Sequence, residues 1–259
     1  MDAGLSILNS HLHSETLMPK LMVERTYAKS PLAVQEPESV QVTDFLEFSL
    51  PESLRTWRYH LIKRSLDFVF STFLIALFAV PGILIALAIR LSSKGPVFYR
   101  ETRIGRNGRR FRIWKFRSMH RDAPKRAHAG SARSGRGVLE WRMRKQMTDP
   151  RITPVGRFLR RWSLDELPQL MNVFCGEMSL VGPRPIVAAE ADYYGDLFDY
   201  YLAATPGLSG LWQVSGRSDI DYPLRAQLDA VYVGTWSLRS DLLILLRTLP
   251  AVLSRRGAR

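Results

Sequence analysis

The stretch FVFSTFLIALFAVPGILIALAI, residues 68–89, decides how this chain is organised. It runs for about 22 residues without a charged side chain, enough for a helix to span the hydrocarbon core of a bilayer. Basic residues lie on both sides of it: Lys63, Arg64, Arg90 and Lys94. Because cytoplasmic flanks tend to be basic, this pattern would keep both ends on one face. Pro81 lies near the midpoint, where its missing N–H group bends a helix.

These features favour a re-entrant helix, which would enter one leaflet, bend near Pro81 and return to the same side. A kinked helix that crosses the bilayer fits the same pattern about equally well. The two topologies differ in their consequences, because a re-entrant helix leaves the segments before and after it on one side, beside the lipid headgroups.

The composition points to an anionic partner. The chain has 259 residues, 46% of them hydrophobic, which allows one medium-sized domain with a core plus a tail or a membrane element. Its formal net charge of +13 is uneven, because residues 1–52 carry −5 and the rest carries +18. Nucleic acid, an acidic membrane surface and a phosphate-rich substrate all fit a field of this sign.

Cysteine and histidine usage excludes other classes of protein. The single cysteine, Cys175, rules out an internal disulfide framework, and the five histidines lack partners at zinc-ligand spacings. The opening of the chain lacks a basic start followed by an apolar run, so it does not match a signal peptide. We expect residues 1–53 to form a flexible tail, since they show no sustained periodicity.

A β-hairpin is expected after the apolar stretch. The segment VFYRETRIGRNGRRFRIWKFRSM, residues 97–119, has two partly alternating halves around Asn107-Gly108, a strong turn signal. Its many arginines alternate with aromatic residues, which could bind single-stranded nucleic acid. A solvated basic face with aromatics packed inward is the more common outcome of such a pattern. The polar, basic residues 120–147 are expected to form a mobile loop beside a site.

The most informative stretch is DPRITPVGRFLRRWSLDELPQLMNVFCGEMSLVGPRP, residues 149–185. Ser163 and Glu166 match a capping box, and the apolar spacing that follows predicts a short helix beginning near Asp165. The acidic pair would complement the dipole of that helix. The same dipole would hold Asp165 ionised as a nucleophile toward phosphorus, and Glu166 could hold Mg²⁺.

Two arginines near this pair suit a diphosphate substrate. Arg160 precedes the pair by about one turn, and Arg184 lies between Pro183 and Pro185. The guanidinium fork matches phosphate oxygens, and flanking prolines lower the entropy cost of presenting it. No P-loop occurs in the sequence, so nothing supports ATP binding.

Several long motifs resemble the bacterial sugar transferases, and more narrowly the monotopic phosphoglycosyl transferases that initiate exopolysaccharide or glycoconjugate assembly. They are KRSLD (63–67), KFRSM (115–119), DPRIT (149–153), SLDELPQLMNV (163–173), MSLVGPRP (178–185) and TPGLSGLWQVSGR (205–217). The resemblance covers about residues 57–254 and keeps the family's motif order. It is closest to the short members that consist of the catalytic domain alone.

The resemblance implies a reaction and its residues. A hexose-1-phosphate would pass from a UDP-sugar to undecaprenyl phosphate with release of UMP, through a phosphosugar linked to an aspartate. The nucleophile would be Asp165 and the Mg²⁺-binding partner Glu166, with nucleotide-sugar contacts from Arg160, Arg184 and Arg217 and the membrane bend at Pro81. Some members have a serine before that proline, where this chain has Val80. Galactose or glucose is the expected sugar, and a 2-acetamido sugar stays open.

The expected fold is α+β and mainly helical, with a small antiparallel hairpin, a re-entrant membrane helix and interfacial amphipathic helices. The expected regions are a tail (1–53), the membrane helix region (54–94) and a catalytic domain (95–259) on the cytoplasmic face of the bacterial inner membrane. A leucine stripe from Leu238 to Leu253 fits either a core-facing or an interfacial helix, which Pro250 should interrupt. Self-association is possible.

Two rival functions are compatible with the composition. One is a membrane-tethered basic protein that binds nucleic acid or acidic lipid without catalysis, which the ordered motifs disfavour. The other is an ordinary glycosyltransferase, which would release UDP rather than UMP. The nucleotide product therefore distinguishes the two enzymes.

Overall fold

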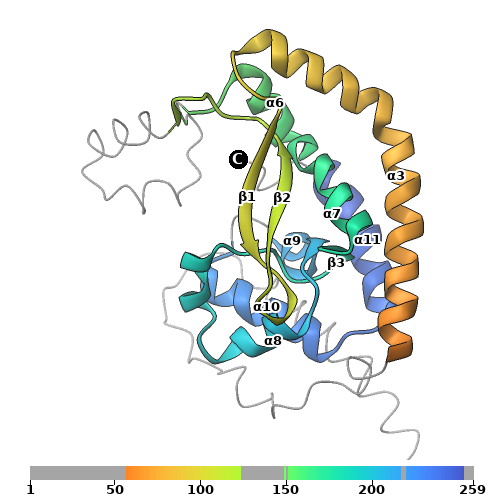
Figure 1. Cartoon of the computed structure of the whole chain (residues 1–259). Helices are drawn as coiled ribbons and strands as arrows, with labels where there is room; N and C mark the ends of the chain where they lie inside the picture. Colours follow the sequence, from red (N-terminus) through yellow and green to blue (C-terminus); the bar gives the residue numbers. More distant parts are fainter. Residues whose placement is uncertain (1–56, 124–148, 150, 217–219, 254–259) are drawn as a thin grey trace, which may run out of the picture. The chain divides into compact units, whose positions relative to one another are not determined.

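The computed structural model describes residues 57–123, 149, 151–216 and 220–253, all within the unit Leu46–Arg259. The expected tail (1–53), most of the expected loop (120–147) and Arg217 lie outside these residues. Helices dominate the described part, as expected, together with an antiparallel hairpin (Figure 1). The helices and strands are α3 (Trp57–Ser92), β1 (Phe98–Ile104), η2 (Arg106–Gly108), β2 (Arg110–Phe116), α6 (Pro154–Arg161), η3 (Leu164–Gln169), α7 (Leu170–Cys175), β3 (Ser179–Val181), η4 (Ala188–Tyr193), η5 (Gly195–Leu197), α8 (Phe198–Ala203), β4 (Gly207–Ser209), α9 (Leu211–Ser215), α10 (Tyr222–Gly234) and α11 (Leu238–Leu253).

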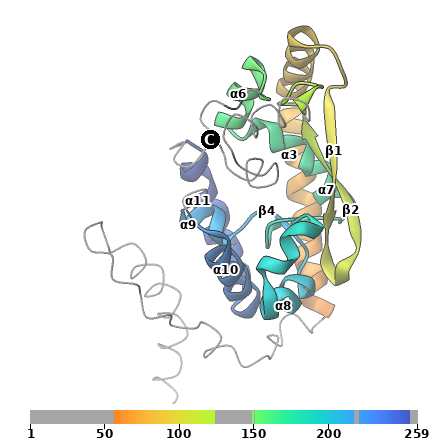
Figure 2. The same cartoon turned by 90° about the vertical axis from the view of Figure 1, so that its left-hand side faces the viewer.

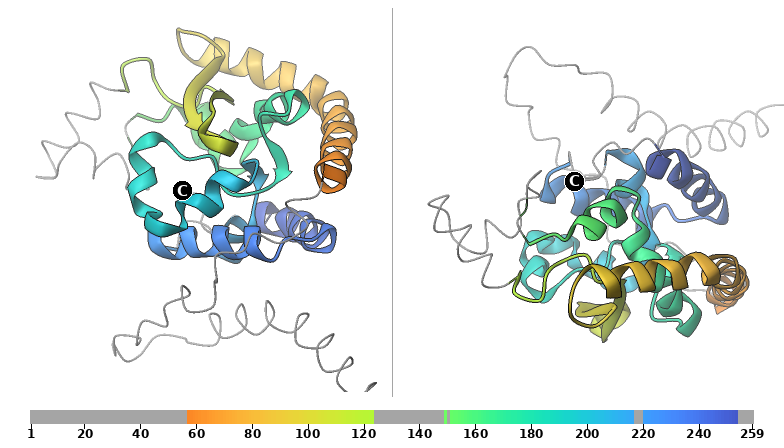
Figure 3. Two further views of the ribbon diagram at one scale, coloured as in Figure 1. Left: turned by 60° about the horizontal axis from the view of Figure 1, so that its bottom comes forward. Right: turned by 90° about the horizontal axis from the view of Figure 1, so that it is seen from above.

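Helix α3 carries the apolar stretch and exposes most of it. Among the described residues it is the one helix long and apolar enough to cross a membrane, with a mean hydropathy of 2.6 and 6% of its most apolar window buried. Its exposed side chains include Phe73, Leu77 and Leu87. Pro81 lies inside this 36-residue helix. The ribbon changes direction between its orange beginning and its gold end, which Figure 3 shows from two further sides.

Charged residues just before the apolar stretch attach α3 to the rest of the fold. Lys63 Nζ lies 2.6 Å from Asp241 Oδ2 of α11. Asp67 Oδ1 accepts a hydrogen bond of 2.9 Å from the backbone N–H of Leu180 in β3. Arg64 donates to the carbonyl groups of Val173 and Phe174 in the last turn of α7, where a cation complements the negative end of a helix. The KRSLD motif is therefore a set of structural contacts in this chain.

Strands β1 and β2 form the expected hairpin, with Phe98 paired to Phe116 and Ile104 to Arg110. Asn107 and Gly108 at its tip both have positive φ, 55° and 73°, which explains the turn signal of this dipeptide. Strand β2 packs Phe111 inward, so the inward-packing reading of the aromatics is right for this strand. Strand β1 differs, because both of its aromatic residues, Phe98 and Tyr99, are exposed.

A second sheet was not anticipated from the sequence. Strands β3 and β4 are three residues each and pair in parallel, Ser179 with Gly207 and Val181 with Ser209. A Cβ atom on Gly207 would lie 2.0 Å from the backbone nitrogen of Gly182, so only glycine allows this approach. The pair lies between the hairpin and the layer of α10 and α11 (Figure 2).

Two local expectations were wrong. Ser163 has a φ of 54° and its side chain makes no capping bond, so there is no capping box. A capping side chain needs an extended backbone to reach the next turn, and the left-handed Ser163 cannot provide it. Helix α11 continues through Pro250 to Leu253. Pro250 lies in the last turn, where it removes a single hydrogen bond.

Candidate active site

The acidic pair lies in the short 3₁₀ helix η3, which packs against β2. Asn172 of α7 fixes this arrangement, because its side-chain amide completes the outer edge of β2. Its Oδ1 accepts from the N–H of Trp114 at 3.0 Å, and its Nδ2 donates to the carbonyl of Arg112 at 2.8 Å. Asn172 is fully buried, so these bonds have no competition from water. The hairpin and the acidic pair therefore form one rigid piece.

Lys115 of β2 reaches the acidic pair directly. Its Nζ lies 2.9 Å from Oε1 of Glu166, and both side chains are partly exposed. From the sequence pattern, Lys115 was expected among the solvated residues of the basic hairpin, and this contact was not predicted. No local signal could reveal it, since the two residues are 51 positions apart.

Asp165 is almost completely buried, with 9% of its surface exposed. Burial raises the pKa of its carboxyl group, and the neighbouring Glu166 raises it further. Lys115 and Arg160 oppose this shift without cancelling it. The expectation that a helix dipole holds Asp165 ionised is not supported, because η3 is a short 3₁₀ helix and burial dominates. Nearby cations are what favour its charged form.

Arg160 comes from the last turn of α6 and points to the same region. Its Nε donates to Ser118 Oγ at 2.9 Å, directly after β2. Burial lowers the pKa of its guanidinium group, and the charge of Asp165 acts in the opposite direction. Helix α6 is held in place by Thr153, whose side chain caps the helix by accepting from the N–H of Gly156 at 2.8 Å. Arg160 thus approaches the acidic pair from a well-anchored helix.

The DPRIT segment supplies a further ion pair beside Arg160. Asp149 Oδ2 accepts from Arg151 Nη2 at 2.7 Å and from its Nε at 3.0 Å. Burial alone would raise the pKa of Asp149, but the hydrogen bonds and charge of Arg151 outweigh it, and the pKa lies below its usual range. This pair is a structural contact that the sequence analysis quoted without assigning it a role.

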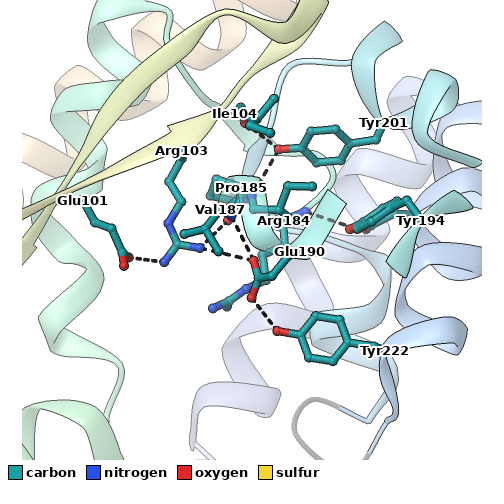
Figure 4. A network of polar contacts seen from close by, with 12 residues as sticks. Glu101, Arg103, Ile104, Arg184, Pro185, Val187, Glu190, Tyr194, Tyr201 and Tyr222 are labelled. Atoms are coloured by element: carbon teal, nitrogen blue, oxygen red, sulfur yellow. Dashed lines mark hydrogen bonds and ion pairs between the residues drawn. The ribbon is translucent and has the colours of Figure 1, made fainter. Parts of the chain in front are cut away.

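Arg184 lies in the loop between β3 and η4, and neighbouring groups hold the backbone of this loop (Figure 4). Arg103 Nη1 donates to the carbonyl of Pro185 at 3.0 Å. The N–H of Ile186 donates to Tyr201 Oη at 3.2 Å, and the N–H of Arg184 itself to Asp229 Oδ2 at 3.4 Å. The loop therefore presents its arginine from a fixed backbone.

Glu190 links this loop to the hairpin and to α10 (Figure 4). Its Oε2 accepts from the N–H of Val187 at 3.0 Å and lies 3.6 Å from Arg103 Nη1. Its Oε1 accepts a hydrogen bond from the hydroxyl of Tyr222. Burial would lower the pKa of Arg184, but Glu166 first and Glu190 second raise it above its usual range. Arg184 is therefore a firmly charged cation.

Asp229 is a buried carboxylate behind the arginine loop. Its Oδ2 accepts from Tyr194 Oη at 2.8 Å, while its Oδ1 has no hydrogen-bond partner within the described residues. Burial raises its pKa to about 7, against the hydrogen bonds of Tyr194 and Arg184. No motif or spacing in the sequence pointed to this residue.

A small pocket joins these parts. It is lined by Glu166 and Lys115 on the hairpin side, by Arg184 and Arg103, and by Gln213 of α9. Asp165 adjoins the pocket as the chain neighbour of Glu166. Arg160 lies close enough for its charge to interact with both acids. Of the five side chains expected to act on a diphosphate, four therefore lie in one region, and the fifth, Arg217, is not among the described residues. An anionic group in this pocket would meet several cations and one acidic pair.

Comparison with known proteins now decides the family, since residues 58–255 match the family model described as "Bacterial sugar transferase". The chain belongs to the bacterial sugar transferase family. It is 44% identical over 197 residues, 76% of this chain and 87% of the relative, to the "Exopolysaccharide production protein ExoY" of Rhizobium meliloti (strain 1021). Within the family, the motifs KFRSM, SLDELPQLMNV, MSLVGPRP and TPGLSGLWQVSGR contribute residues to the pocket beside the acidic pair, whereas KRSLD lies elsewhere.

Other relatives carry more specific names. The chain is 47% identical over 199 residues to the "Undecaprenyl-phosphate galactose phosphotransferase" of Salmonella typhimurium (strain LT2), covering 76% of this chain and 41% of that protein. It is 45% identical over 206 residues to the "UDP-glucose:undecaprenyl-phosphate glucose-1-phosphate transferase" of Caulobacter vibrioides (strain CB 15), covering 76% of this chain and 71% of that protein. These names differ in the sugar.

The acidic pair offers carboxylate oxygens that could hold a magnesium ion. Across the part of the chain that the structure describes, no group of three or more His, Cys, Asp or Glu side chains is arranged around a common point. Mg²⁺ usually takes one or two carboxylates and completes its shell with water and substrate phosphates. Asp165 and Glu166 meet that lower requirement, although Lys115 shares Glu166 Oε1. The residues fit a magnesium ion that arrives with a diphosphate.

Proposed function

We propose that this chain transfers a hexose-1-phosphate from a UDP-sugar to undecaprenyl phosphate, releasing UMP, as the first membrane step of exopolysaccharide or glycoconjugate synthesis. The observation that carries the proposal is the acidic pair Asp165 and Glu166 among Lys115, Arg160 and Arg184, in a member of this family. The names of the relatives support both the nucleotide sugar and the lipid acceptor.

In the first half of the reaction, a carboxylate oxygen of Asp165 attacks the β-phosphorus of the UDP-sugar. The bond from this phosphorus to the bridging oxygen breaks, and UMP leaves with that oxygen. The guanidinium group of Arg184 and the ammonium group of Lys115 face the phosphate oxygens and stabilise the charge that develops there. Asp165 is left as an acyl phosphate that carries the hexose.

In the second half, a phosphate oxygen of undecaprenyl phosphate attacks the phosphorus of the linked phosphosugar. The bond from this phosphorus to Asp165 breaks, which gives the lipid diphosphate sugar and restores the carboxylate. One site thus serves a water-soluble donor and a lipid acceptor in turn. Glu166 would hold Mg²⁺, which when bound would neutralise phosphate charge.

We place the site at the cytoplasmic face of the inner membrane, beside a re-entrant helix α3 that bends at Pro81. The exposed apolar side chains of α3 support contact with lipid tails. Helix α11 supports an interfacial location, because its leucines Leu242, Leu246 and Leu249 are exposed rather than packed in the core. A lipid acceptor would then reach the acidic pair from the adjacent leaflet.

The test supplies purified protein with a panel of UDP-sugars, undecaprenyl phosphate and Mg²⁺, and measures both the nucleotide and the lipid product. UMP together with a lipid diphosphate sugar is expected, and the panel identifies the hexose. With labelled donor alone, the native protein should trap a phosphosugar on a peptide that contains Asp165. Release of UDP would indicate an ordinary glycosyltransferase, and a protein that binds nucleic acid without turnover would indicate the non-enzymatic rival.

A further inference from the structure

A larger cavity lies apart from the acidic pair, between the beginning of α3, the tip of the hairpin and the end of α10. It is lined by polar and aromatic side chains that include Tyr59, His60, Lys63, Arg106 and Trp236. It shares no residue with the pocket that contains Glu166 and Arg184. The hairpin tip is about 20 Å from Lys115 along β2, at roughly 3.3 Å per residue. The cavity therefore needs an explanation of its own.

Most charges around this cavity are already matched. Lys63 is paired with Asp241, whose Oδ1 also accepts from Tyr232 Oη at 2.7 Å. Asp67 accepts from the N–H of Leu180, and Arg64 donates to the carbonyl groups at the end of α7. Each of these groups already has a structural partner within the fold.

Arg106 is different, because among the described residues neither a carboxylate nor a carbonyl group accepts from its guanidinium group. Its Nη1 and Nη2 each lie 3.2 Å from a ring nitrogen of His60. An imidazole ring carries no negative charge, so it cannot neutralise the guanidinium group. A neutral imidazole has one acceptor nitrogen, so it can satisfy only one of these donors. The Nε of Arg106 is buried with no hydrogen-bond partner in the described part of the chain. A cation is therefore held at the cavity without an anion.

A second donor at the same cavity is also unmatched. Trp236 Nε1 is buried and has no partner within the described ranges. The Trp236 ring packs edge-to-face on Tyr59, and Lys63 Nζ lies 5.9 Å from its centre, so its position is fixed. Two buried N–H groups without acceptors, one of them on a cation, are costly unless a ligand supplies oxygen atoms. The chemistry that fits both is an oxyanion.

The turn of α3 that lines the cavity exposes apolar side chains on its other side. Tyr59, His60 and Lys63 point to the cavity, whereas Leu61 and Ile62 are 57% and 48% exposed. The same exposed face continues along the apolar part of α3. The cavity thus lies beside the part of α3 where contact with lipid tails begins, which is the depth of lipid phosphate groups.

We propose that this cavity is a second anion site, which binds a phosphate group through Arg106 and Trp236. The adjoining apolar face favours a phospholipid headgroup as the source of that phosphate, and free phosphate is the alternative source of the same chemistry. The site is separate from the transfer reaction. It would fix the beginning of α3 at the level of the headgroups.

The experiment measures binding of short-chain phosphatidylglycerol to the full-length protein in neutral detergent by native mass spectrometry. Arg106→Gln removes the unmatched cation, and Trp236→Phe removes only the N–H group while keeping the ring. Arg109→Gln is the matched control, because it removes the same charge from the exposed side of the same hairpin tip. Arg106→Gln should weaken binding about tenfold and Trp236→Phe about threefold or more, with less than a twofold change for the control.

Competition with inorganic phosphate distinguishes the two sources. If millimolar phosphate displaces the lipid from native protein and binds in its place, the site takes free phosphate; if it does not, the lipid headgroup is the ligand. Thermal unfolding of each variant checks that the fold is intact. Equal lipid and phosphate binding by native protein, Arg106→Gln and Trp236→Phe, all folded, would overturn the proposal. The proposal would also be overturned if Arg109→Gln weakened binding as much as Arg106→Gln does. Binding would then depend on the net charge of the hairpin tip and not on a specific site.

Discussion

At the scale of single residues, the proposed nucleophile Asp165 lowers the stability of the folded protein at neutral pH. Its pKa is raised by burial first and by Glu166 second, so the folded state holds the proton more tightly than the unfolded state does. The stability that this provides is complete at low pH and is lost as pH rises past the ordinary range of a carboxyl group. At pH 7.5 this raised pKa therefore lowers the stability of the native protein relative to low pH.

Asp165→Asn removes this titratable group with almost no change in volume. Its Tm in detergent at pH 7.5 should lie ~2–4 °C above that of the native protein. Release of UMP should fall at least about 1000-fold, because an amide cannot form the acyl phosphate. The two measurements are separate, since a loss of activity with a lower Tm would indicate only a damaged fold. Substantial turnover by a folded variant would exclude Asp165 as the nucleophile.

Asp229 gives a second prediction with a defined pH range. Its pKa is about 7, against an ordinary value of 3.8, because burial opposes its charge. Its contribution to stability is complete below about pH 4 and is lost as pH rises to about 7. Asp229→Asn should therefore stabilise the protein relative to native at pH 8 by up to ~2–4 kcal/mol, and by much less at pH 5. The measurement is denaturant unfolding at both pH values, and a difference independent of pH would contradict the assignment.

Residue types and motifs identified part of this site in advance. Asp165, Glu166 and Arg184 lie in motifs that could be read from the sequence alone, and the structure places them in one region. Lys115 and Asp229 could not be found in the same way, because each acts through a partner that is distant in the chain. A lysine in a basic strand and an aspartate in a helix carry no local sign of such partners.

At the scale of elements, the loop that carries Arg184 is the part where rigidity should matter most. Neighbouring groups hold its backbone at successive positions, so a side chain with a different geometry cannot recover its contacts by a shift of the loop. Arg184→Lys keeps the charge and removes the fork that fits phosphate. We expect it to lower kcat/KM for the UDP-sugar about 10- to 100-fold, or ~1.4–2.7 kcal/mol.

Arg109→Lys is the control for this substitution. Arg109 lies at the exposed tip of the basic hairpin, so the same change there should alter kcat/KM less than about twofold. Steady-state kinetics of both variants with one UDP-sugar decides the point. Comparable losses in the two variants would show that net charge, rather than the fixed loop, determines donor binding.

Element types could be predicted more fully than element details. The Asn107-Gly108 dipeptide predicted the hairpin because these two residue types adopt positive φ values by local preference, and both do so here. Ser163 and Pro250 were misread because tertiary packing overrides local rules: a left-handed Ser163 fits the turn into η3, and Pro250 is tolerated at the end of α11. The parallel pair of β3 and β4 depends on the approach of two glycines that are distant in sequence, which no periodicity reveals.

At the scale of the whole molecule, the sequence predicted a membrane-associated helix and left its topology open. The structure shows one long helix that changes direction and contains Pro81 (Figure 3). Contacts hold both of its ends to other elements of one compact unit: Lys63 pairs with α11, and Arg117 after β2 donates to the carbonyl of Ser93 at 2.6 Å. An ordinary span would have to carry these two ends to opposite faces of a bilayer.

This arrangement predicts that single cysteines at Ser53 and Thr102, placed in separate Cys175→Ser proteins, react with a membrane-impermeant maleimide from the same side of sealed vesicles. The exposed native Cys175 must be removed first, since it would react as well. Pro81→Leu restores the missing backbone hydrogen bond and extends the apolar run, so it should straighten α3 and move a measurable fraction of the Ser53 cysteine to the opposite face. If the variant labels like the parent, the contacts at Lys63 and Arg117 fix the topology, and Pro81 only shapes the helix between them. If the two cysteines of the parent itself label from opposite faces, α3 crosses the bilayer, and the lipid acceptor would have to reach Asp165 by another route.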